Sequence, residues 1–219
     1  MEVDRIICGD CLDVMKDMPD NSVDLVLTDP PYGIGLEYDT YNDSRENLTA
    51  LAGPFVLEAT RISRVVAFTP GNGNQHIYPP PSWTMAWFYK GGANYCSWGF
   101  NCWQPILCYG KDPYLANGLG CRADAFVLEE TPKDKMHPCP KPMGVMDYLV
   151  NRFSVRPNDL ILDPFCGSGT TCVAAKMLGR RYIGIDISEK YCEIARKRIA
   201  AAEKGITVNE LEKGQKVLF

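Results

Sequence analysis

Short apolar runs alternate with helical patterns in the last third of the chain, and this alternation restricts the possible folds more than any other feature. Residues 143–153, 170–178 and 189–202 have helical periodicity, and residues 160–162 and 182–185 are strand-like. Ser188 and Gly205 are placed to cap the last helix. Strands and helices at this spacing form a parallel sheet covered on both faces. We therefore predict a doubly wound α/β fold with a mostly parallel sheet.

The first third of the chain repeats this pattern in compressed form. Residues 5–8 and 23–27 are strand candidates on either side of a short helix at 12–18, so they predict a β-α-β unit. A helix at 47–61 and a buried strand at 65–68 follow.

The middle of the chain has a different character, since it is rich in glycine, proline and aromatic residues. We predict loops and short strands here, forming a small insertion over one end of the sheet. The alternative is that its rings only fill a second layer of core, and we expect a mixture in which some rings are exposed. The chain then divides into residues 1–70, a small insertion at 71–131, and residues 132–219.

Composition is that of an ordinary folded protein, with 46% hydrophobic and 23% charged residues among 219. No apolar run approaches the roughly 20 residues that cross a bilayer. The start, Met1-Glu2-Val3-Asp4, is acidic where a signal peptide is basic. We expect a cytoplasmic protein with no membrane partner.

Ten cysteines in a reducing compartment act mostly as small apolar side chains, so we expect no disulfide framework. Cys8 and Cys11 have the spacing of a metal-ligand or redox pair. A zinc ribbon needs a second such pair, but Cys96, Cys102 and Cys108 are separated by five residues each. We therefore expect no metal site.

Charge is distributed unevenly along the chain. The net charge is −4, with −10 in residues 1–60 and +3 in each of the segments 61–160 and 161–219. The total disfavours a nucleic-acid partner. The middle segment would nevertheless form either a basic face or a solvated surface of mixed sign. Its basic residues include Lys133, Lys135, Lys141, Arg152 and Arg156.

A glycine-rich loop, Asp163-Pro-Phe-Cys-Gly-Ser-Gly-Thr-Thr171, lies between a predicted strand and a predicted helix. Its glycines allow close approach of a ligand to the helix N-terminus. The third glycine of a dinucleotide loop and the lysine of a P-loop are both missing, which favours a nucleotide-like ligand without phosphates. Asp163 suits an ammonium group on that ligand. Asp186, after the next strand, is placed either to bind ribose hydroxyls or to act as a helix N-terminal charge.

A second motif, Thr28-Asp29-Pro30-Pro31-Tyr32, directly follows a predicted strand. The two prolines fix the backbone, so the Asp29 carboxylate and the Pro30 carbonyl form a rigid pair of acceptors. Such a pair suits a planar amine with two hydrogens, and Tyr32 offers a ring for stacking on a flat base. Alone, the motif would also be compatible with a simple turn.

Taken together, these motifs closely resemble the S-adenosylmethionine-dependent amino-methyltransferases of DNA, in the circularly permuted β class known from restriction-modification systems. Residues 8–12 and 137–142 resemble further segments of that family. The resemblance covers residues 4–70 and 132–203, whereas residues 71–131 match only in placement. It implies a Rossmann-like methyltransferase fold with a catalytic half at 1–70, a target-recognition region at 71–131 and a cofactor half at 132–219.

The resemblance also implies roles for individual residues. Asp29 and the Pro30 carbonyl, stiffened by Pro31, would hold the target amine, and Tyr32 would stack on the flipped base. Asp186 would bind the cofactor ribose, Asp10 would lie near its adenine, and Lys141 would begin a helix that covers its methionine end. The remaining cofactor residues are Asp163, Phe165, Gly167, Ser168, Gly169 and Thr170.

The expected substrate is double-stranded DNA with the target base flipped out. The resemblance favours adenine, because cytosine enzymes of the group usually carry serine in place of Asp29. Methylation of cytosine, of RNA or of a protein amine, and an inactive DNA-binding homologue, are the alternatives. We expect residues 33–49 to close over the base and the aromatic run from Trp87 to Trp103 to contact DNA. The insertion is small, so the target sequence is short or a partner, such as a second copy in a homodimer, contributes recognition.

Overall fold

The computed structural model describes residues 2–38, 40–89, 94–96, 98–129 and 141–216. Its strands are β1 (Arg5–Cys8), β2 (Val23–Thr28), β3 (Ser63–Phe68), β4 (Trp83–Phe88), β5 (Asn94–Cys96), β6 (Gly99–Asn101), β7 (Trp103–Gly110), β8 (Ala125–Val127), β9 (Leu160–Asp163) and β10 (Arg181–Asp186). Its helices are α1 (Cys11–Lys16), α2 (Arg45–Ile62), the 3-10 turn η1 (Gln75–Ile77), α3 (Pro113–Ala116), α4 (Met143–Phe153), α5 (Thr170–Met177), α6 (Glu189–Glu203) and α7 (Val208–Lys216).

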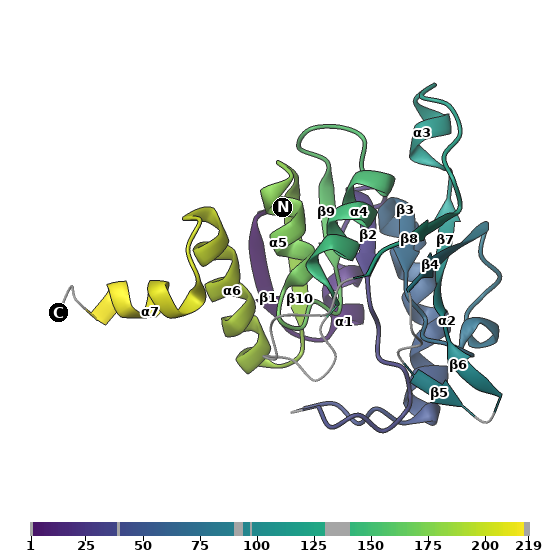
Figure 1. Cartoon of the computed structure of the whole chain (residues 1–219), viewed down its shortest axis with the longest axis horizontal. Helices are drawn as coiled ribbons and strands as arrows, with labels where there is room; N and C mark the ends of the chain where they lie inside the picture. Colours follow the sequence, from purple (N-terminus) through teal and green to yellow (C-terminus); the bar gives the residue numbers. More distant parts are fainter. Residues whose placement is uncertain (1, 39, 90–93, 97, 130–140, 217–219) are drawn as a thin grey trace.

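An eight-stranded sheet with the order β1-β10-β9-β2-β3-β7-β4-β8 forms the centre of the molecule (Figure 1). Neighbouring strands are parallel except where β7 pairs with β3 on one side and β4 on the other. Strand β7 is therefore antiparallel to the other strands of this sheet. The mixed, mostly parallel sheet confirms the predicted α/β class.

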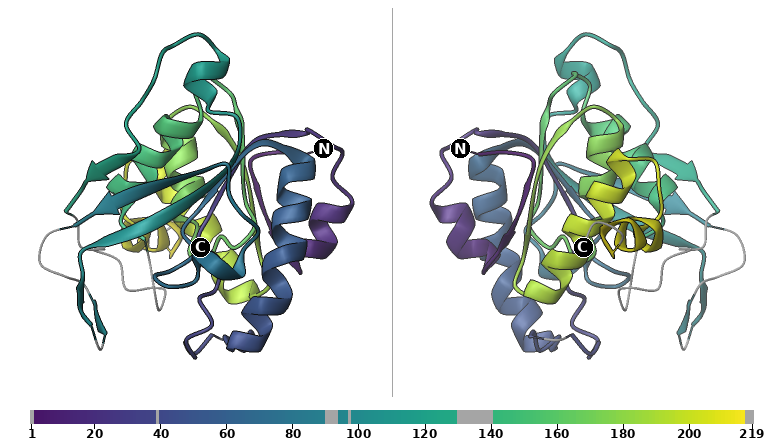
Figure 2. Two further views of the ribbon diagram at one scale, coloured as in Figure 1. Left: turned by 90° about the vertical axis from the view of Figure 1, so that its right-hand side faces the viewer. Right: turned by 90° about the vertical axis from the view of Figure 1, so that its left-hand side faces the viewer.

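Helices cover both faces of the sheet (Figure 2). Helices α4, α5 and α6 pack on the face that carries Leu25 and Leu27, and α1 and α2 pack on the face that carries Val26. Because neighbouring strand residues point to opposite faces, a strand with apolar residues throughout serves both cores. No helix in the described ranges is long and apolar enough to cross a membrane.

The predicted elements of both end segments are present, with shifts of a residue or two at most boundaries. Strand β1 and helix α4 have the predicted ends. The β-α-β unit of β1, α1 and β2 is present, and β10 and β9 lie between its two parallel strands in the sheet. Strand β1 thus pairs with β10, with Cys8 opposite Asp186.

The middle segment contributes more to the sheet than an insertion would. Strands β4, β7 and β8 extend the main sheet, and β5 and β6 form a separate two-stranded hairpin. The core of β7 is a continuous buried run that includes Ile106, Leu107 and Cys108. Aromatic residues and glycines at its flanks obscure this strand signal in the sequence.

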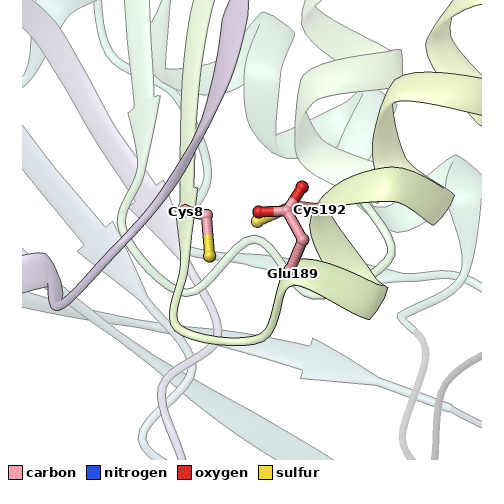
Figure 3. A group of neighbouring side chains, drawn as sticks. All are labelled: Cys8, Glu189 and Cys192. Atoms are coloured by element: carbon pink, nitrogen blue, oxygen red, sulfur yellow. The ribbon is translucent and has the colours of Figure 1, made fainter.

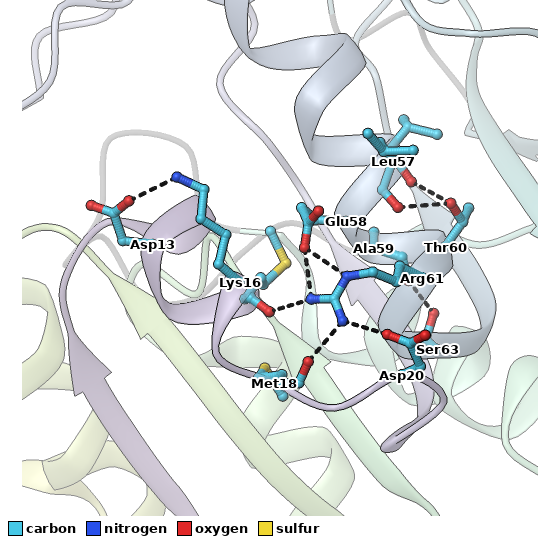
Figure 4. Close-up of polar contacts among 12 residues, drawn as sticks. Asp13, Lys16, Met18, Asp20, Leu57, Glu58, Ala59, Thr60, Arg61 and Ser63 are labelled. Carbon is cyan, nitrogen blue, oxygen red and sulfur yellow. Dashed lines mark hydrogen bonds and ion pairs between the residues drawn. The ribbon is translucent and has the colours of Figure 1, made fainter.

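An arginine at the end of α2 fixes the turn that leads into β2 (Figure 4). Arg61 donates hydrogen bonds to the carbonyls of Met15 (2.8 Å) and Met18 (2.9 Å), and it pairs with Glu58 (2.7 Å) and Asp20 (2.6 Å). These contacts tie the last turn of α1 and the turn after it to the end of α2. They also hold the start of β2, whose far end carries the Asp-Pro-Pro-Tyr motif.

Candidate active site

The predicted site residues follow strands that end at one edge of the sheet. Strands β9 and β2 lie side by side, but their following helices, α5 and α2, cover opposite faces. Ligands of open α/β sheets bind outside the carboxyl ends of the strands at such a switch point. Asp163 ends β9, Asp186 ends β10, and Asp29 follows β2.

Asp29 is the centre of a network of hydrogen bonds. Its Oδ1 accepts short hydrogen bonds from the hydroxyls of Tyr32 and Thr69, and its Oδ2 accepts one from Lys141 Nζ at 2.7 Å. The Lys141 and Asp29 side chains are only 9% and 19% exposed, so this ion pair is largely shielded from solvent. A carboxylate has about four acceptor positions, and three donors therefore leave room for one more.

Tyr32 is held from several sides. Its hydroxyl accepts hydrogen bonds from Lys141 Nζ (2.5 Å) and Gln104 Nε2 (2.9 Å), and Lys141 Nζ lies 5.0 Å from the ring centroid. At Gly71, whose φ is +80°, a Cβ atom would lie 2.8 Å from the Tyr32 ring, so only glycine fits there. Burial raises the pKa of Tyr32. Tyr32 is thus a neutral hydrogen-bond donor to Asp29.

Asp163 links the two sequence motifs directly. Its Oδ1 accepts hydrogen bonds from Thr28 Oγ1 at 2.5 Å and from the Phe165 amide at 3.2 Å. Asp163 is buried, and this burial raises its pKa to about 6 although its hydrogen bonds act in the opposite direction. The residue before Asp29 is therefore tied to the start of the glycine-rich loop.

One cavity joins the two motifs, which are separated by more than a hundred residues in the chain. The space that it spans is about 730 Å³ when the open solvent at its mouth is included. Of the predicted site residues, it is lined by Asp10, Asp29, Pro31, Phe165, Gly167 and Asp186.

Backbone amides orient the carboxylates on the far wall of this cavity. Asp186 accepts hydrogen bonds from the amides of Gly167 (2.8 Å) and Ser188 (2.9 Å). Asp10 is the N-cap of α1 and accepts from the amides of Leu12 (2.8 Å) and Asp13 (3.3 Å). Both amides donate to Oδ1 of Asp10, so its Oδ2 remains suited to a ligand hydroxyl or amino group.

The rest of the predicted glycine-loop residues lie outside the cavity lining. Ser168 and Thr170 accept hydrogen bonds from Arg198 of α6, at 2.8 Å and 3.1 Å. A Cβ atom at Gly169 would lie 2.8 Å from that of Ala195, so this glycine allows α5 and α6 to pack closely. These three residues therefore fix the glycine-rich loop to α6 and do not face the cavity.

Lys141 likewise does not line the cavity, and it precedes α4 rather than beginning it, because Pro142 is the N-cap. Residues 137–140 of the same family-like segment lie outside the described residues. Thr69 and Gln104, which contact Asp29 and Tyr32, were not predicted as site residues. Thr69 directly follows strand β3, and its position after a predicted parallel strand could have indicated a site residue.

The segment after Tyr32 folds around a buried aspartate. Asp43 is 2% exposed, and its carboxylate accepts hydrogen bonds from the amides of Gly33 (2.6 Å), Ile34 (3.1 Å) and Leu36 (3.1 Å). Tyr38 and Tyr41 of this segment line the cavity and contact each other edge to face. Sequence analysis missed both rings. Movement of this segment over a base stays a prediction.

The cavity fits a cationic nucleoside better than a phosphate ligand. Carboxylates of Asp10, Asp29 and Asp186 line it, which favours positive charge. Two of these carboxylates, Asp10 and Asp29, belong to the acidic segment 1–60, so the cavity accounts for part of the negative charge there. Of the residues named for a basic face, Lys141 and Arg152 do not form one, because their side chains are 9% and 7% exposed and pair with Asp29 and Asp112. Arg156 is exposed. Lys133 and Lys135 lie outside the described residues.

Comparison with known proteins is consistent with this geometry. Residues 85–197 match the family model described as DNA methylase. The chain is 32% identical to the protein YubD of Escherichia coli (strain K12), and the match covers 92% of each chain. The chain belongs to the N6/N4 DNA methylase family. Methylases of this family take their methyl group from S-adenosylmethionine, the cofactor expected from the sequence.

Solved structures share the fold of this DNA methylase. The complex of M1.HpyAVI with S-adenosylmethionine is 20% identical, with a TM-score of 0.64 over 89% of this chain and 98% of that one. The cytosine-N4-specific PvuII DNA methyltransferase is 17% identical, with a TM-score of 0.64 over 87% and 84% of the two chains. A similar fold therefore occurs in a methylase that modifies cytosine, and fold alone leaves the target base of the DNA methylase open.

Proposed function

We propose that this DNA methylase transfers a methyl group from S-adenosylmethionine to the exocyclic amine of adenine in double-stranded DNA. The observation that carries the proposal is the single cavity lined by Asp29 and Pro31 on one side and by Gly167 and Asp186 on the other. The target base leaves the duplex to reach it, at a cost of a few kcal/mol. In this proposal the catalytic half is residues 1–70 and the target-recognition region is residues 71–131. The cofactor-binding half is residues 132–219.

Asp29 and the Pro30 carbonyl accept the two hydrogens of the target amine. Conjugation with the ring delocalises the lone pair of that amine and makes it a poor nucleophile. Two fixed acceptors draw the nitrogen toward tetrahedral geometry, so the lone pair becomes available on one side. The remaining acceptor position on Asp29 takes the amine, while Tyr32, Thr69 and Lys141 hold the carboxylate. The proton leaves through Asp29 to water after transfer.

The walls around Asp10 and Asp186 bind the cofactor. When bound, S-adenosylmethionine supplies an electrophilic methyl group on a positively charged sulfur. Asp186 accepts hydrogen bonds from the ribose hydroxyls, Asp10 lies by the adenine, and Phe165 and Gly167 form the intervening wall. Asp163 contributes negative charge behind this wall, next to Thr28. Ser168, Gly169 and Thr170 support the loop through α6.

Adenine is favoured over cytosine by Asp29, since serine usually stands at this position in the cytosine enzymes that the sequence resembles. We expect DNA from cells expressing the chain to contain N6-methyladenine at one short sequence, and DNA from cells expressing Asp29→Ala to lack it. Sequencing of modified bases gives the base and the site together. N4-methylcytosine would contradict the choice of base, and methylated RNA with unmodified DNA would contradict the DNA substrate.

The β5–β6 hairpin is suited to contact the duplex during base flipping. It continues β4 and β7 beyond Phe88 and Trp103, which lie near the carboxyl end of β3 (Figure 1). Trp98 and Phe100 are 97% and 73% exposed. Exposed rings near a base-flipping site stack on bases or wedge between them. Recognition by a second copy of the chain stays a prediction.

Replacement of Trp98 and Phe100 together by alanine should weaken binding of duplex DNA by at least about 30-fold, because two stacked rings together contribute about 2–6 kcal/mol. Binding of S-adenosylmethionine should not change. Fluorescence anisotropy with a labelled target duplex measures the first quantity, and calorimetry measures the second. Met177→Ala is the matched control. It removes a 58% exposed side chain at the C-terminal end of α5, whereas the glycine-rich loop precedes the N-terminal end of that helix. Unchanged DNA affinity in the double variant would rule out this contact.

A further inference from the structure

Cys8 faces a different cysteine from the one its sequence spacing suggests. Cys11 is buried in the core at the start of α1, whereas Cys8 lies exposed at the end of β1. Across from Cys8, the first turn of α6 presents Glu189 and Cys192 (Figure 3). One ligand atom from each of these three residues lies within 4.8 Å of the other two. Within the described residues, three potential metal ligands are therefore gathered at one point.

The backbone aims both thiols toward this point. Cys192 Sγ lies 3.5 Å from the Asp186 carbonyl oxygen, and Cys8 Sγ lies 3.7 Å from the Ile187 carbonyl oxygen. Glu189 and Cys192 are three residues apart in α6, so they share one helix face. They also lie in the first turn of α6, shortly after the end of β10. One potential ligand at the end of β1 thus faces two from the start of α6.

The charge balance around the cluster also suits a divalent cation. Two thiolates and one carboxylate around such a cation leave a net charge of −1. Arg196 Nη1 lies 2.5 Å from Glu189 Oε1, and Arg196 Nη2 donates to the Ile6 carbonyl at 3.2 Å. Its guanidinium therefore neutralises the loaded cluster from the next turns of α6. Cys8 and Glu189 are exposed, which gives an ion access from solvent and leaves a fourth position for water.

We propose that Cys8, Glu189 and Cys192 form a binding site for Zn²⁺. Two sulfur ligands and a carboxylate favour zinc over calcium or magnesium, which prefer oxygen alone. On binding, each thiol S–H bond breaks, its proton passes to solvent, and a sulfur–zinc bond forms with no change in oxidation state. The ion joins the end of β1 to the start of α6. It braces the strand ends behind Gly9 and Asp186, which line the cofactor cavity.

Titration of the untagged, reduced full chain with Co²⁺ tests this site, because tetrahedral thiolate-bound cobalt has intense visible bands and a sulfur charge-transfer band. We expect one equivalent to bind and Zn²⁺ to displace it. Cys8→Ser and Cys192→Ser should lose the charge-transfer intensity, and Glu189→Gln should bind at least ~10-fold more weakly. Cys102→Ser and Cys121→Ser remove other exposed cysteines and should behave as the parent chain.

Thermal unfolding provides a second measurement that does not involve spectroscopy of cobalt. Zn²⁺ should raise the unfolding temperature of the parent chain and of Cys121→Ser, since a ligand that binds the folded state stabilises it. It should not raise that of Cys8→Ser, whose exposed position keeps the fold intact. A Cys8→Ser variant that binds cobalt like the parent chain, or a parent chain without thiolate bands, would overturn the proposal.

Discussion

Asp29→Ala should lower the rate of methyl transfer at saturating DNA and cofactor by at least ~10³-fold, because it removes an acceptor that acts on the amine as charge develops. The variant also leaves the Lys141 ammonium without its partner at 2.7 Å. Asp29→Asn keeps the shape of the side chain but replaces one acceptor oxygen by a donor, so it should be nearly as inactive. Transfer of a labelled methyl group to duplex DNA measures the rate.

Two controls separate chemistry from folding in this experiment. Asp13→Ala removes an exposed carboxylate that pairs with Lys16 on the surface of α1, and it should retain full activity. Calorimetric titration with S-adenosylmethionine should show that Asp29→Ala still binds cofactor, because Asp10, Gly167 and Asp186 are unchanged. If Asp29→Ala transferred methyl groups within tenfold of the parent rate, Asp29 would have no part in the chemistry.

Asp163→Asn should stabilise the protein above pH 7 while weakening cofactor binding. Burial raises the pKa of Asp163 to about 6 from an ordinary 3.8, so the folded state holds its proton more tightly than the unfolded state. This group therefore lowers stability as pH rises from about 4 to about 6, and the full cost of about 3 kcal/mol is present above that range. Asparagine carries no charge, and its oxygen still accepts from Thr28 and the Phe165 amide.

Urea unfolding at a series of pH values measures this difference. The free energy of unfolding of Asp163→Asn minus that of the parent chain should rise between pH 4 and 6 and then stay level. Asp13→Asn, at an exposed position, should show no such rise. A difference that is constant across this range would mean that Asp163 titrates normally in the folded protein. A buried aspartate at position 163 that lowers the stability of the folded protein is expected where function and stability conflict.

The sequence predicted the parts of the fold that depend on local pattern. Helix α4 and strand β1 have the predicted ends because their apolar periodicity and flanking residues are clear. The meeting of Asp29, Asp163 and Asp186 at one edge followed from their places after parallel strands. The roles predicted for these residues in chemistry stay predictions.

Features that depend on contacts between distant residues were not predictable in this way. The pairing of Lys141 with Asp29 joins residues 112 positions apart, and no local pattern indicates it. Strand β7 was hidden by its aromatic flanks, although its buried centre is as apolar as the parallel strands. The position of β1 beside β10 depends on the whole sheet, and the β-α-β pattern does not indicate which strand pairs with β1.

The pairing of β1 with β10 also determines when the protein is able to fold during its synthesis. Arg5 lies opposite Ile183, and Cys8 opposite Asp186, so β1 finds its partner only after the residues up to Asp186 have been translated. Contacts between residues so far apart in sequence are slow to form. The nascent chain therefore holds β1 without its partner strand until β10 has been translated.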